Sequence, residues 1–489
     1  MSFPITALLP DLRAALDAHP RLILEAPPGA GKTTQVPPAL LDASWLRGRK
    51  ILLLEPRRIA ARAAAEFMAS QRGESVGATI GYRIRFESKV SAATRIEVVT
   101  EGILTRMIQD DPELAGVGAI LFDEFHERHL HGDLGAALAL DVQANLRPEL
   151  RLVIMSATLD GERIARWFDA PQRISEGRSF PVRIAHPPAR ANEAWPERGW
   201  PFHLRRAVEQ ALAENAGDVL VFLPGRREIE QTRAALSSQL PAAGTDAVSL
   251  VALHGELSLA EQHAALAPAA PGMRRIVLAT NVAESSLTLP GVRAVVDSGL
   301  AREPRFDPNS GFTRLDTVTI SQASADQRAG RAGRLGPGAC YRLWPQSRRL
   351  DAARTPEIAQ VELSQLALEL AAWGSDALRW LDPPPGGALA QARDLLRALG
   401  ALDDAGRITA EGRAMLALGA QPRLAAAVLR TSSQAERRLA CDLAALIEAR
   451  NPLRGESARS DDFRLRSAAL QAWRERRAQG SRELGADPG

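Results

Sequence analysis

A glycine-rich turn around a single lysine is the segment of this chain whose residue types best suit chemistry. Only three of the 61 basic residues are lysines, and one of them, Lys32, lies within Gly29-Ala30-Gly31-Lys32-Thr33-Thr34. Backbone N–H groups of such a turn can surround a phosphate, and the compact ammonium of lysine reaches it as a point charge. A lysine at this place in an arginine-rich chain predicts that Lys32 binds phosphate in a nucleoside triphosphatase.

Two adjacent acids, Asp123 and Glu124, directly follow the apolar run at 119–122. Ligands of open α/β sheets bind at the carboxyl ends of the strands, so these acids should meet the turn that contains Lys32. Carboxylates there can hold Mg²⁺ through water and activate an attacking water. We therefore predict that Thr33 and Asp123 bind Mg²⁺, and that Glu124 orients or deprotonates the attacking water.

A third candidate element is the octapeptide Gln327-Arg328-Ala329-Gly330-Arg331-Ala332-Gly333-Arg334. Arginines at every third position lie along one helical face and can neutralise charge on a transferring phosphoryl group. This spacing favours Arg331 and Arg334 as arginine fingers supplied from within the same chain. The alternative, in a chain with 58 arginines, is a solvated arginine face.

The histidines that follow the two acids allow two interpretations. His126, His129 and His131 suggest zinc, but a His-Glu-x-x-His helix would need a histidine at position 130, which is Leu130. We favour a role for His126 in communication between the nucleotide and a second domain. A metal-ligand cluster is the alternative.

Short apolar runs alternate with helical patterns in two successive parts of the chain, which predicts two parallel sheets covered on both faces. The strands expected in the first part are 21–26, 50–54, 95–99, 119–122 and 151–155. Those expected in the second part are 218–222, 249–252, 275–279 and 294–296. The Pro- and Arg-rich segment 171–201 is expected to join the two.

The remaining patterns predict a hairpin followed by a helical region. Alternating apolar and polar residues within 300–320 flank the turn signal Asp307-Pro308-Asn309-Ser310-Gly311, which indicates a protruding antiparallel hairpin. Residues 361–373 and 388–399 have amphipathic helical patterns, and 402–409 suggests a small wing.

Composition favours a cytoplasmic soluble protein. The chain has 489 residues, 45% hydrophobic and 24% charged, with a net charge of only +3. Two cysteines are too few for a disulfide framework, and we find neither a signal peptide nor an apolar run of membrane-spanning length. The small net charge implies that a nucleic-acid partner would be held in a local channel.

Together these motifs resemble the DEAH-type superfamily 2 helicases, and among them the bacterial HrpB-like ATP-dependent RNA helicases. Order and spacing agree throughout residues 20–345. Beyond the motifs above, the matching segments are Glu55-Pro56-Arg57-Arg58, Thr100-Glu101-Gly102, Ser156-Ala157-Thr158, Phe222-Leu223-Pro224-Gly225 and the run from Ala279 to Thr288.

The resemblance implies an α/β fold of two tandem RecA-like P-loop domains, at 1–175 and 176–350. A winged-helix domain at 351–420 and a partial helical ratchet domain at 421–489 would follow. Chains of this type run well beyond residue 489, so we expect a C-terminally truncated form or a fragment.

For the nucleotide site, the resemblance implies roles residue by residue. The turn would bind phosphates and Mg²⁺ through Gly29, Ala30, Gly31, Lys32, Thr33 and Thr34. Gln327 would join Arg331 and Arg334 on the γ-phosphate side, and Ser286 and Thr288 would contact the ribose.

For the nucleic acid, the resemblance implies a grip on the strand backbone by Arg57, Arg58, Thr100 and Thr280. Ser156 and Thr158 would couple hydrolysis to domain movement. His126 would communicate between the nucleotide and the second domain. The hairpin around 308–311 would separate strands.

Three positions depart from the family pattern. Phe125 replaces an alanine, Leu266 stands near the place of an aromatic ring on the nucleotide base, and Pro290 stands where many relatives have an acid near the ribose. The last two departures predict weak base selectivity, so that ATP and other NTPs are hydrolysed.

We expect an ATP-driven translocase on single-stranded RNA, without a membrane role and with protein partners unknown. Two alternatives stay open: an ATP-switched RNA clamp that does not unwind, and a DNA helicase, because no residue pattern reads the 2′-OH. A generic P-loop kinase fits least, since it does not need an arginine-rich octapeptide in a second α/β domain.

Overall fold

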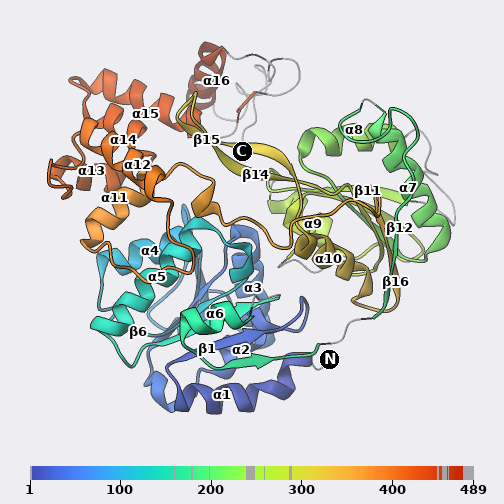
Figure 1. Cartoon of the computed structure of the whole chain (residues 1–489), viewed down its shortest axis with the longest axis horizontal. Coiled ribbons are helices and arrows are strands. Elements are labelled where there is room, and N and C mark those ends of the chain that lie inside the picture. Colours follow the sequence, from blue (N-terminus) through green and yellow to red (C-terminus); the bar gives the residue numbers. More distant parts are fainter. Residues whose placement is uncertain are drawn as a thin grey trace. The chain divides into compact units, whose positions relative to one another are not determined.

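The computed structural model describes residues 3–157, 161–177, 180–197, 199–237, 248–257, 259–285, 289–448, 451–453, 457, 460 and 462–476 (Figure 1). The chain forms two compact units. One comprises Met1–Val361 with Leu378–Pro383, and the other comprises Glu362–Ala377 with Pro384–Gly489.

The first α/β domain of the larger unit is built on an eight-stranded sheet with the order β4-β3-β5-β2-β6-β7-β1-β8. Its pairs are parallel except for β3 with β4. The strands are β1 Arg21–Glu25, β2 Lys50–Leu54, β3 Ile80–Ile84, β4 Glu87–Lys89, β5 Ile96–Val99, β6 Val117–Phe122, β7 Arg151–Ser156 and β8 Gln172–Ile174.

Helices cover both faces of this sheet. Apolar side chains of α1 Leu9–Ala18, α2 Lys32–Ala39 and α3 Arg58–Gln71 share one core with alternate residues of the central strands. On the other face, α5 Leu130–Asn145 packs closely at Gly135 against Leu104 of α4 Glu101–Asp110 and Phe122 of β6. The short elements are η1 Pro4–Leu8, η2 Ser44–Leu46, η3 Phe125–Glu127 and α6 Gly161–Phe168.

The second α/β domain has a six-stranded parallel sheet with the order β11-β12-β10-β13-β16-β9. Its strands are β9 Val182–Ala185, β10 Asp218–Phe222, β11 Val248–Leu253, β12 Arg274–Ala279, β13 Val292–Asp297 and β16 Gly338–Arg342. Its helices are α7 Trp200–Glu214, α8 Arg226–Ser237, α9 Leu259–Leu266, η4 Asn281–Ala283, α10 Gln322–Gly330 and η5 Arg331–Gly333.

The nine strands predicted from apolar runs are all present, but β3, β4, β8, β9 and β16 were not predicted. β4 and β8 have three residues each, with no fully buried position, so they carry no continuous apolar signal. The predicted linker 171–201 was too broad: it contains β8 of the first sheet and β9 of the second. The chain therefore passes from one sheet to the other between Ile174 and Val182.

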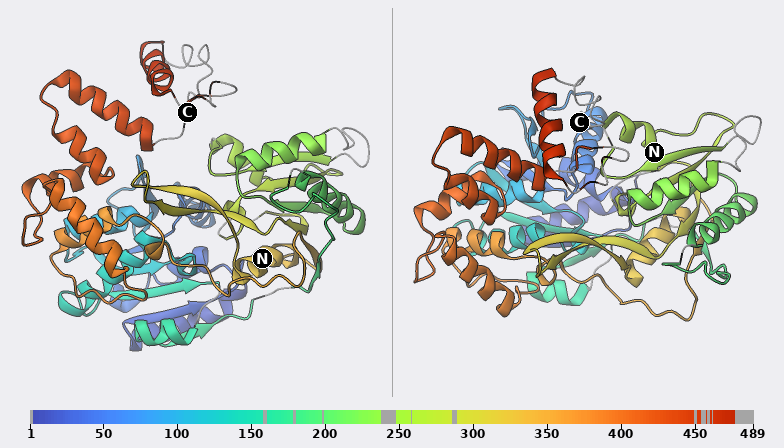
Figure 2. Two further views of the ribbon diagram at one scale, coloured as in Figure 1. Left: turned by 45° about the horizontal axis from the view of Figure 1, so that its top comes forward. Right: turned by 90° about the horizontal axis from the view of Figure 1, so that it is seen from above.

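The predicted antiparallel hairpin is confirmed as β14 Leu300–Asp307 and β15 Phe312–Thr319, drawn in yellow in Figure 2. Gly311 in the turn has φ 72°, a conformation that favours glycine. Two contacts hold the hairpin to the segment 354–360. Arg354 pairs with Glu303 at 2.8 Å, and the Phe306 N–H donates to the Gln360 carbonyl at 2.7 Å.

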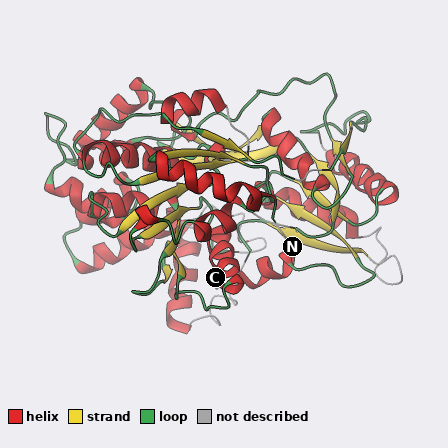
Figure 3. Ribbon diagram, turned by 90° about the horizontal axis from the view of Figure 1, so that it is seen from below, coloured by secondary structure: helices red, strands yellow, loops and turns green. Residues whose placement is uncertain are grey.

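The smaller unit is helical, and the named strands of the described residues all lie in the larger one (Figure 3). Its helices are α11 Ser364–Trp373, α12 Gly386–Ala398, α13 Ala410–Leu418, α14 Pro422–Leu429, α15 Gln434–Glu448 and α16 Phe463–Arg476. The small wing expected at 402–409 is present as an antiparallel bridge between Leu402 and Ile408. Thr409 then caps α13 by accepting from the Gly412 N–H.

No helix in the described part of the chain is both long and apolar enough to cross a membrane. A short helix, η6 Glu357–Ala359, precedes the smaller unit.

Candidate functional site

The glycine-rich turn connects β1 to α2, as the sequence predicts. Gly29 and Gly31 have φ 87° and 95°, so the backbone adopts left-handed conformations that glycine permits at little cost. Gly31 is the N-cap of α2, and Lys32 is its first residue. The backbone N–H groups at a helix start carry partial positive charge and suit a phosphate.

The two acids lie directly against Lys32, although about 90 residues separate them in sequence. Its Nζ lies 2.9 Å from Glu124 Oε1 and 3.6 Å from Asp123 Oδ1. The Thr33 hydroxyl donates to Asp123 Oδ2 at 2.5 Å. The sheet produces this arrangement, because β6 and β1 flank β7 and all three end at one edge. The predicted phosphate lysine, metal residues and water-activating acid therefore form one cluster.

The two carboxyl groups differ in their protonation. Burial raises the pKa of Asp123 to about 6, against the opposing charge of Lys32. Burial acts in the same direction on Glu124, but the charge of Lys32 and its hydrogen bond outweigh it, so the pKa of Glu124 is lowered. Glu124 Oε2 is buried and has no hydrogen-bond partner among the described residues. Glu124 is thus ionised, which suits the water-activating role predicted for it.

Of the two predicted arginine fingers, Arg331 is buried and Arg334 is partly buried, and the charge of Glu124 acts on both. Burial lowers the pKa of Arg331 well below its usual value, and the charge of Arg334 adds to the effect. Burial also lowers the pKa of Arg334 to about 10, while Glu124 opposes this shift. A Cβ built on Gly29 would lie 3.9 Å from the Arg334 guanidinium, so this arginine faces the turn. An anion there would stabilise both charges.

Arg328, the first arginine of the octapeptide, has a different environment. Its side chain is fully buried and pairs with Glu284 at 2.8 Å and Asp297 at 2.9 Å. Its guanidinium also lies 4.7 Å from the centre of the Phe222 ring. A solvated arginine face, the alternative considered from the sequence, would need these side chains to be exposed. Arg328 instead pairs with acids of the second domain, and Arg331 is only 3% exposed.

His126 lies at the meeting point of the acids and the second domain. Its Nε2 is 3.2 Å from Gln327 Nε2, and its Nδ1 accepts from the Ala157 N–H at 3.5 Å. Glu124 Oε2 lies 3.6 Å from the same Nδ1. Burial lowers the pKa of His126, so the ring is neutral. These contacts suit the role predicted for His126 in communication between the nucleotide and the second domain. Ser156, which precedes Ala157 in the chain, is buried.

A buried network around Glu127 was not predicted. Glu127 accepts two hydrogen bonds from Arg57, at 2.9 and 3.0 Å, and one from the Ser285 hydroxyl at 2.5 Å. Arg57 also donates to the Asn281 carbonyl at 2.7 Å, so first-domain residues contact second-domain residues here. The opposite charge of Arg57 lowers the pKa of Glu127 well below its usual value in spite of burial.

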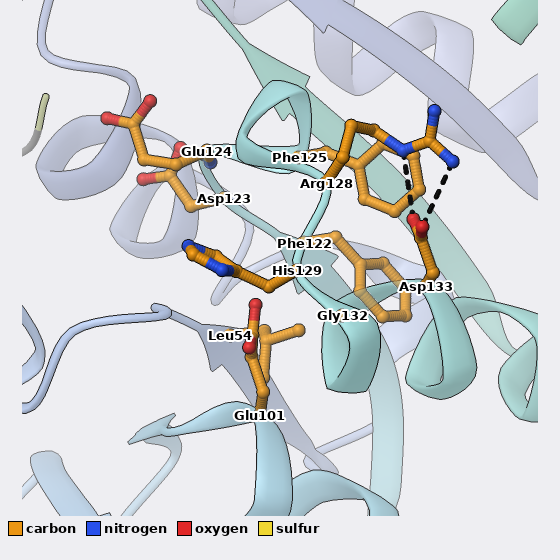
Figure 4. Close-up of a pocket in the computed structure, with 10 residues that line it drawn as sticks. All are labelled: Leu54, Glu101, Phe122, Asp123, Glu124, Phe125, Arg128, His129, Gly132 and Asp133. Carbon is orange, nitrogen blue, oxygen red and sulfur yellow. Dashed lines mark hydrogen bonds and ion pairs between the residues drawn. The ribbon is translucent and has the colours of Figure 1, made fainter. Parts of the chain in front are cut away.

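His129 lies between two carboxylates at the other side of Glu127. It is 2.8 Å from Glu127 and 2.7 Å from Glu357, whose other oxygen accepts from the Leu130 N–H. Burial would lower the pKa of His129, but Glu101 and these two acids raise it well above the usual value. Figure 4 shows His129 and Glu101 in the pocket that Asp123 and Glu124 also line. Glu357 was not among the predicted residues, because it lies 228 residues from His129 in the sequence.

His126 and His129 contact protein groups, whereas His131 Nδ1 is buried without a hydrogen-bond partner among the described residues. Within the described ranges, no group of three or more His, Cys, Asp and Glu side chains is arranged to hold one.

The residues predicted to grip a strand lie at carboxyl ends of strands. Thr100 and Thr280 are N-caps that follow β5 and β12, and their side chains make no capping hydrogen bond. Arg58 is exposed at the start of α3, whereas Arg57 is held by Glu127 and Asn281. The predicted residues Thr158, Ser286 and Thr288 lie outside the described residues.

The three departures from the family pattern are structurally accommodated. The Phe125 ring stacks on Trp167 with centroids 5.8 Å apart. Leu266 packs against the core of the second sheet, and the Pro290 carbonyl accepts from Arg275 at 2.9 Å.

The comparisons with known proteins agree with this site. A model described as "DEAD/DEAH box helicase" matches residues 12–167, "Helicase conserved C-terminal domain" matches 203–336, and "Helicase associated domain (HA2), winged-helix" matches 392–419. The chain therefore contains a DEAD/DEAH box helicase domain and a helicase C-terminal domain in tandem, followed by a winged-helix region, as the sequence predicts.

The chain is similar to HrpB of Escherichia coli. It is 48% identical over 453 residues to "ATP-dependent RNA helicase HrpB" of strain K12, which covers 91% of this chain and 55% of that protein. Among solved structures, "Crystal structure of Escherichia coli DEAH/RHA helicase HrpB" matches with a TM-score of 0.85 and 45% identity, covering 99% of this chain and 60% of that one. "Crystal structure of E. coli DExH-box NTPase HrpB" matches with a TM-score of 0.82, 44% identity, and coverage of 99% and 59%. The chain thus spans somewhat over half the length of these relatives.

Proposed function

We propose that this protein is an ATP-dependent RNA helicase that couples nucleotide hydrolysis to movement on single-stranded RNA. One observation carries the proposal. Lys32, Asp123 and Glu124 of the first domain form a buried cluster, and the charge of Glu124 acts on two arginines of the second domain, the buried Arg331 and the partly buried Arg334. A triphosphate needs such opposed charges on two sides to be held in line for hydrolysis.

The residues present suit ATP with Mg²⁺. Lys32 and the N–H groups from Gly29 to Thr34 would bind the phosphates, and Thr33 and Asp123 would hold Mg²⁺. The metal would supply charge neutralisation at the phosphates when bound. The short contact between Thr33 and Asp123 supports this assignment, because it places a hydroxyl and a carboxylate together beside the lysine.

In the proposed reaction, Glu124 orients the attacking water and accepts its proton at Oε2. Arg331 and Arg334 stabilise the charge that develops on the transferred group, with Gln327 at the same side. Phosphate release would remove the anion between the domains, so the arginines would favour reopening. His126, Ser156 and Thr158 would transmit this change.

Nucleic acid would be held mainly through its backbone. Three of the residues proposed to contact the backbone follow the carboxyl ends of strands: Arg58, Thr100 and Thr280. Arg57 would take part in this binding while it donates to Glu127. Backbone contacts read little sequence, so weak sequence specificity is expected. Ser286 and Thr288 would contact the ribose, and without an aromatic stack other NTPs would also be hydrolysed. We place this activity in the cytoplasm, as the cysteine usage suggests.

A strand-displacement assay tests the proposal. A short RNA duplex with a single-stranded overhang is mixed with the 489-residue chain and ATP, and release of the labelled strand is followed. Helicase function predicts release that requires hydrolysable ATP and is absent in Glu124→Gln. ATP-dependent binding of the overhang without release would contradict it and favour the clamp.

A further inference from the structure

The segment 354–360 contacts both α/β domains, although it belongs to neither of their sheets. It contains the short helix η6 and follows the last strand of the second domain in the chain. Arg354 pairs with Glu303 of β14 at 2.8 Å. The Gln360 carbonyl accepts from the Phe306 N–H of the same strand at 2.7 Å. The segment is therefore attached to the β14–β15 hairpin at two points.

Glu357, in the middle of this segment, is attached to the first α/β domain through three of its groups. Its Oε1 lies 2.7 Å from His129 Nδ1, and its Oε2 accepts from the Leu130 N–H at 3.0 Å. Its own N–H donates to the Arg128 carbonyl at 3.1 Å. The Glu357 side chain is only 16% exposed, and partial burial strengthens hydrogen bonds to a charged group. One residue thus fixes the segment to the start of α5.

The anchoring residues 128–130 lie close to the nucleotide site in the chain. They directly follow η3, which itself begins directly after the two acids of that site. His129 also lies 2.8 Å from Glu127, which accepts from Arg57 of the first domain and from Ser285 of the second. A displacement of η3 during the nucleotide cycle would therefore displace the anchor of Glu357 as well.

The connection from Glu357 to the hairpin is short and internally hydrogen-bonded. The N–H groups of Gln360 and Val361 donate to the Glu357 carbonyl at 2.8 and 3.0 Å. Ile358 between them is only 1% exposed, so the segment is packed as well as bonded. Energetic coupling between distant sites is carried by such packed and hydrogen-bonded chains. A movement of Glu357 is therefore passed on to β14 rather than absorbed within the segment.

We propose that Glu357 and His129 are positioning residues that transmit the state of the nucleotide site to the β14–β15 hairpin through the segment 354–360. The inference rests on the proposed function and adds to it a route by which hydrolysis reaches the element proposed to separate strands. Residues 128–130 would move with the acids when the site opens or closes, and Glu357 would carry this movement to Phe306.

The test measures strand displacement and ATP hydrolysis in one reaction, on an RNA duplex with a single-stranded overhang. The ratio of strands released to ATP hydrolysed does not depend on the fraction of folded protein, because an unfolded molecule contributes to neither rate. Glu357→Gln keeps the size of the side chain and removes its charge. We expect it to lower the ratio about 2- to 30-fold, the range for loss of coupling contacts, while hydrolysis continues.

A double variant tests whether the two residues act together. His129→Gln should lower the ratio to a similar extent as Glu357→Gln. The variant with both substitutions should be no worse than either single variant, because each removes the same contact.

Hydrogen exchange of the peptide 300–307 gives a second readout that does not need strand displacement. A non-hydrolysable ATP analogue should change the protection of this peptide in the unaltered chain. The change should be smaller or lost in Glu357→Gln, since the link to the nucleotide site is then weakened.

Glu193→Gln provides the matched control. Glu193 accepts two hydrogen bonds from Arg206 of α7, at 2.7 and 2.6 Å, and its side chain is 13% exposed. This ion pair resembles that of Glu357 in burial but lies within the second domain. Its loss should therefore leave the ratio unchanged.

The outcomes separate the inference from the proposed function. A ratio in Glu357→Gln equal to that of the unaltered chain would overturn the inference, as would an equal fall in Glu193→Gln. If the unaltered chain displaced no strand, the proposed function itself would fail, and hydrogen exchange of 300–307 would decide whether the link exists. Protection of this peptide that ignores the ATP analogue would contradict the link.

Discussion

At the scale of single residues, the site depends on how buried charges are balanced. Lys32 is only 4% exposed, and Asp123 and Glu124 neutralise it. Lys32 holds Glu124 in its ionised form before any ligand binds, which the proposed water-activating role requires. Burial holds Asp123 closer to neutrality, and this difference fits the separate roles proposed for the two acids.

Glu124→Gln should abolish turnover while keeping the nucleotide site. The amide has nearly the shape of the carboxylate but cannot accept the proton from water, so we expect kcat to fall by about 10²–10⁴-fold. Nucleotide affinity, measured with a fluorescent ATP analogue, should stay similar. Glu113→Gln, at an exposed position of the same domain, is the control. Turnover of Glu124→Gln equal to that of the control would remove Glu124 from the reaction.

His129 predicts a pH-dependent contribution to stability. Its folded pKa is raised well above the usual 6.5 by Glu101, Glu127 and Glu357 in spite of burial. The stabilisation is therefore complete below about pH 6.5 and is lost as the pH rises through the folded pKa. His129→Gln should cost about 1.5–3 kcal/mol at pH 6 and less at high pH, by urea unfolding. If His129→Gln lowered the free energy of unfolding by the same amount at every pH, the charged form of His129 would not be what stabilises the fold.

At the scale of elements, we assign two functions to the arginines of the octapeptide 327–334. The helix changes from an α-helix to a 3₁₀-helix between them. α10 ends at Gly330 and η5 begins at Arg331, so the arginines do not share one regular face. Arg328 pairs with acids of the second domain, and Arg331 donates to the Glu284 and Ser285 carbonyls of the same domain. The charge of Glu124 of the first domain acts on Arg331 and Arg334.

Substitutions within the octapeptide should separate these functions. Arg331→Ala should lower kcat by about 10³-fold, as for other arginine fingers, and should cost about 1–3 kcal/mol of stability, because it removes buried hydrogen bonds to the Glu284 and Ser285 carbonyls. Arg328→Ala should instead destabilise the protein by about 3–5 kcal/mol, since it leaves Glu284 and Asp297 buried without their partner. Steady-state turnover and urea unfolding of both variants distinguish the two effects. A loss of activity in Arg331→Ala that only follows a loss of folded protein would contradict the assignment.

The β14–β15 hairpin offers a prediction about strand separation. Replacing residues 306–313 by Asn-Gly would close a shorter hairpin on the pair Arg305 and Arg314. We expect this variant to keep RNA-stimulated turnover and to lose strand displacement, because the nucleotide site is untouched. Displacement at the unaltered rate would mean that the hairpin does not separate strands.

At the scale of the whole molecule, the sequence predicted what depends on local pattern. Buried strands such as β2 and β6 are continuous apolar runs, and the turn at Gly29–Thr34 carries its own glycines. The general rule for parallel sheets then placed the acids at the turn. Edge strands such as β4 and β8 were missed, because exposed strands lack that pattern.

Contacts between distant segments were not predictable in this way. Nothing in the sequence pairs His129 with Glu357, or Arg57 with the Asn281 carbonyl, because each pair forms only when separate elements pack. The compact units also differ from the expected domain limits: the smaller unit begins at Glu362, and Leu378–Pro383 belongs with the larger one. The proposed limits at 175, 350 and 420 stay predictions.

We propose that the two α/β domains form one nucleotide site whose turnover is coupled to RNA. NTP hydrolysis by the 489-residue chain, with and without single-stranded RNA and beside single-stranded DNA, tests this most directly. We predict strong stimulation by RNA that is abolished in Glu124→Gln. Turnover that is unchanged by either nucleic acid would contradict the coupling.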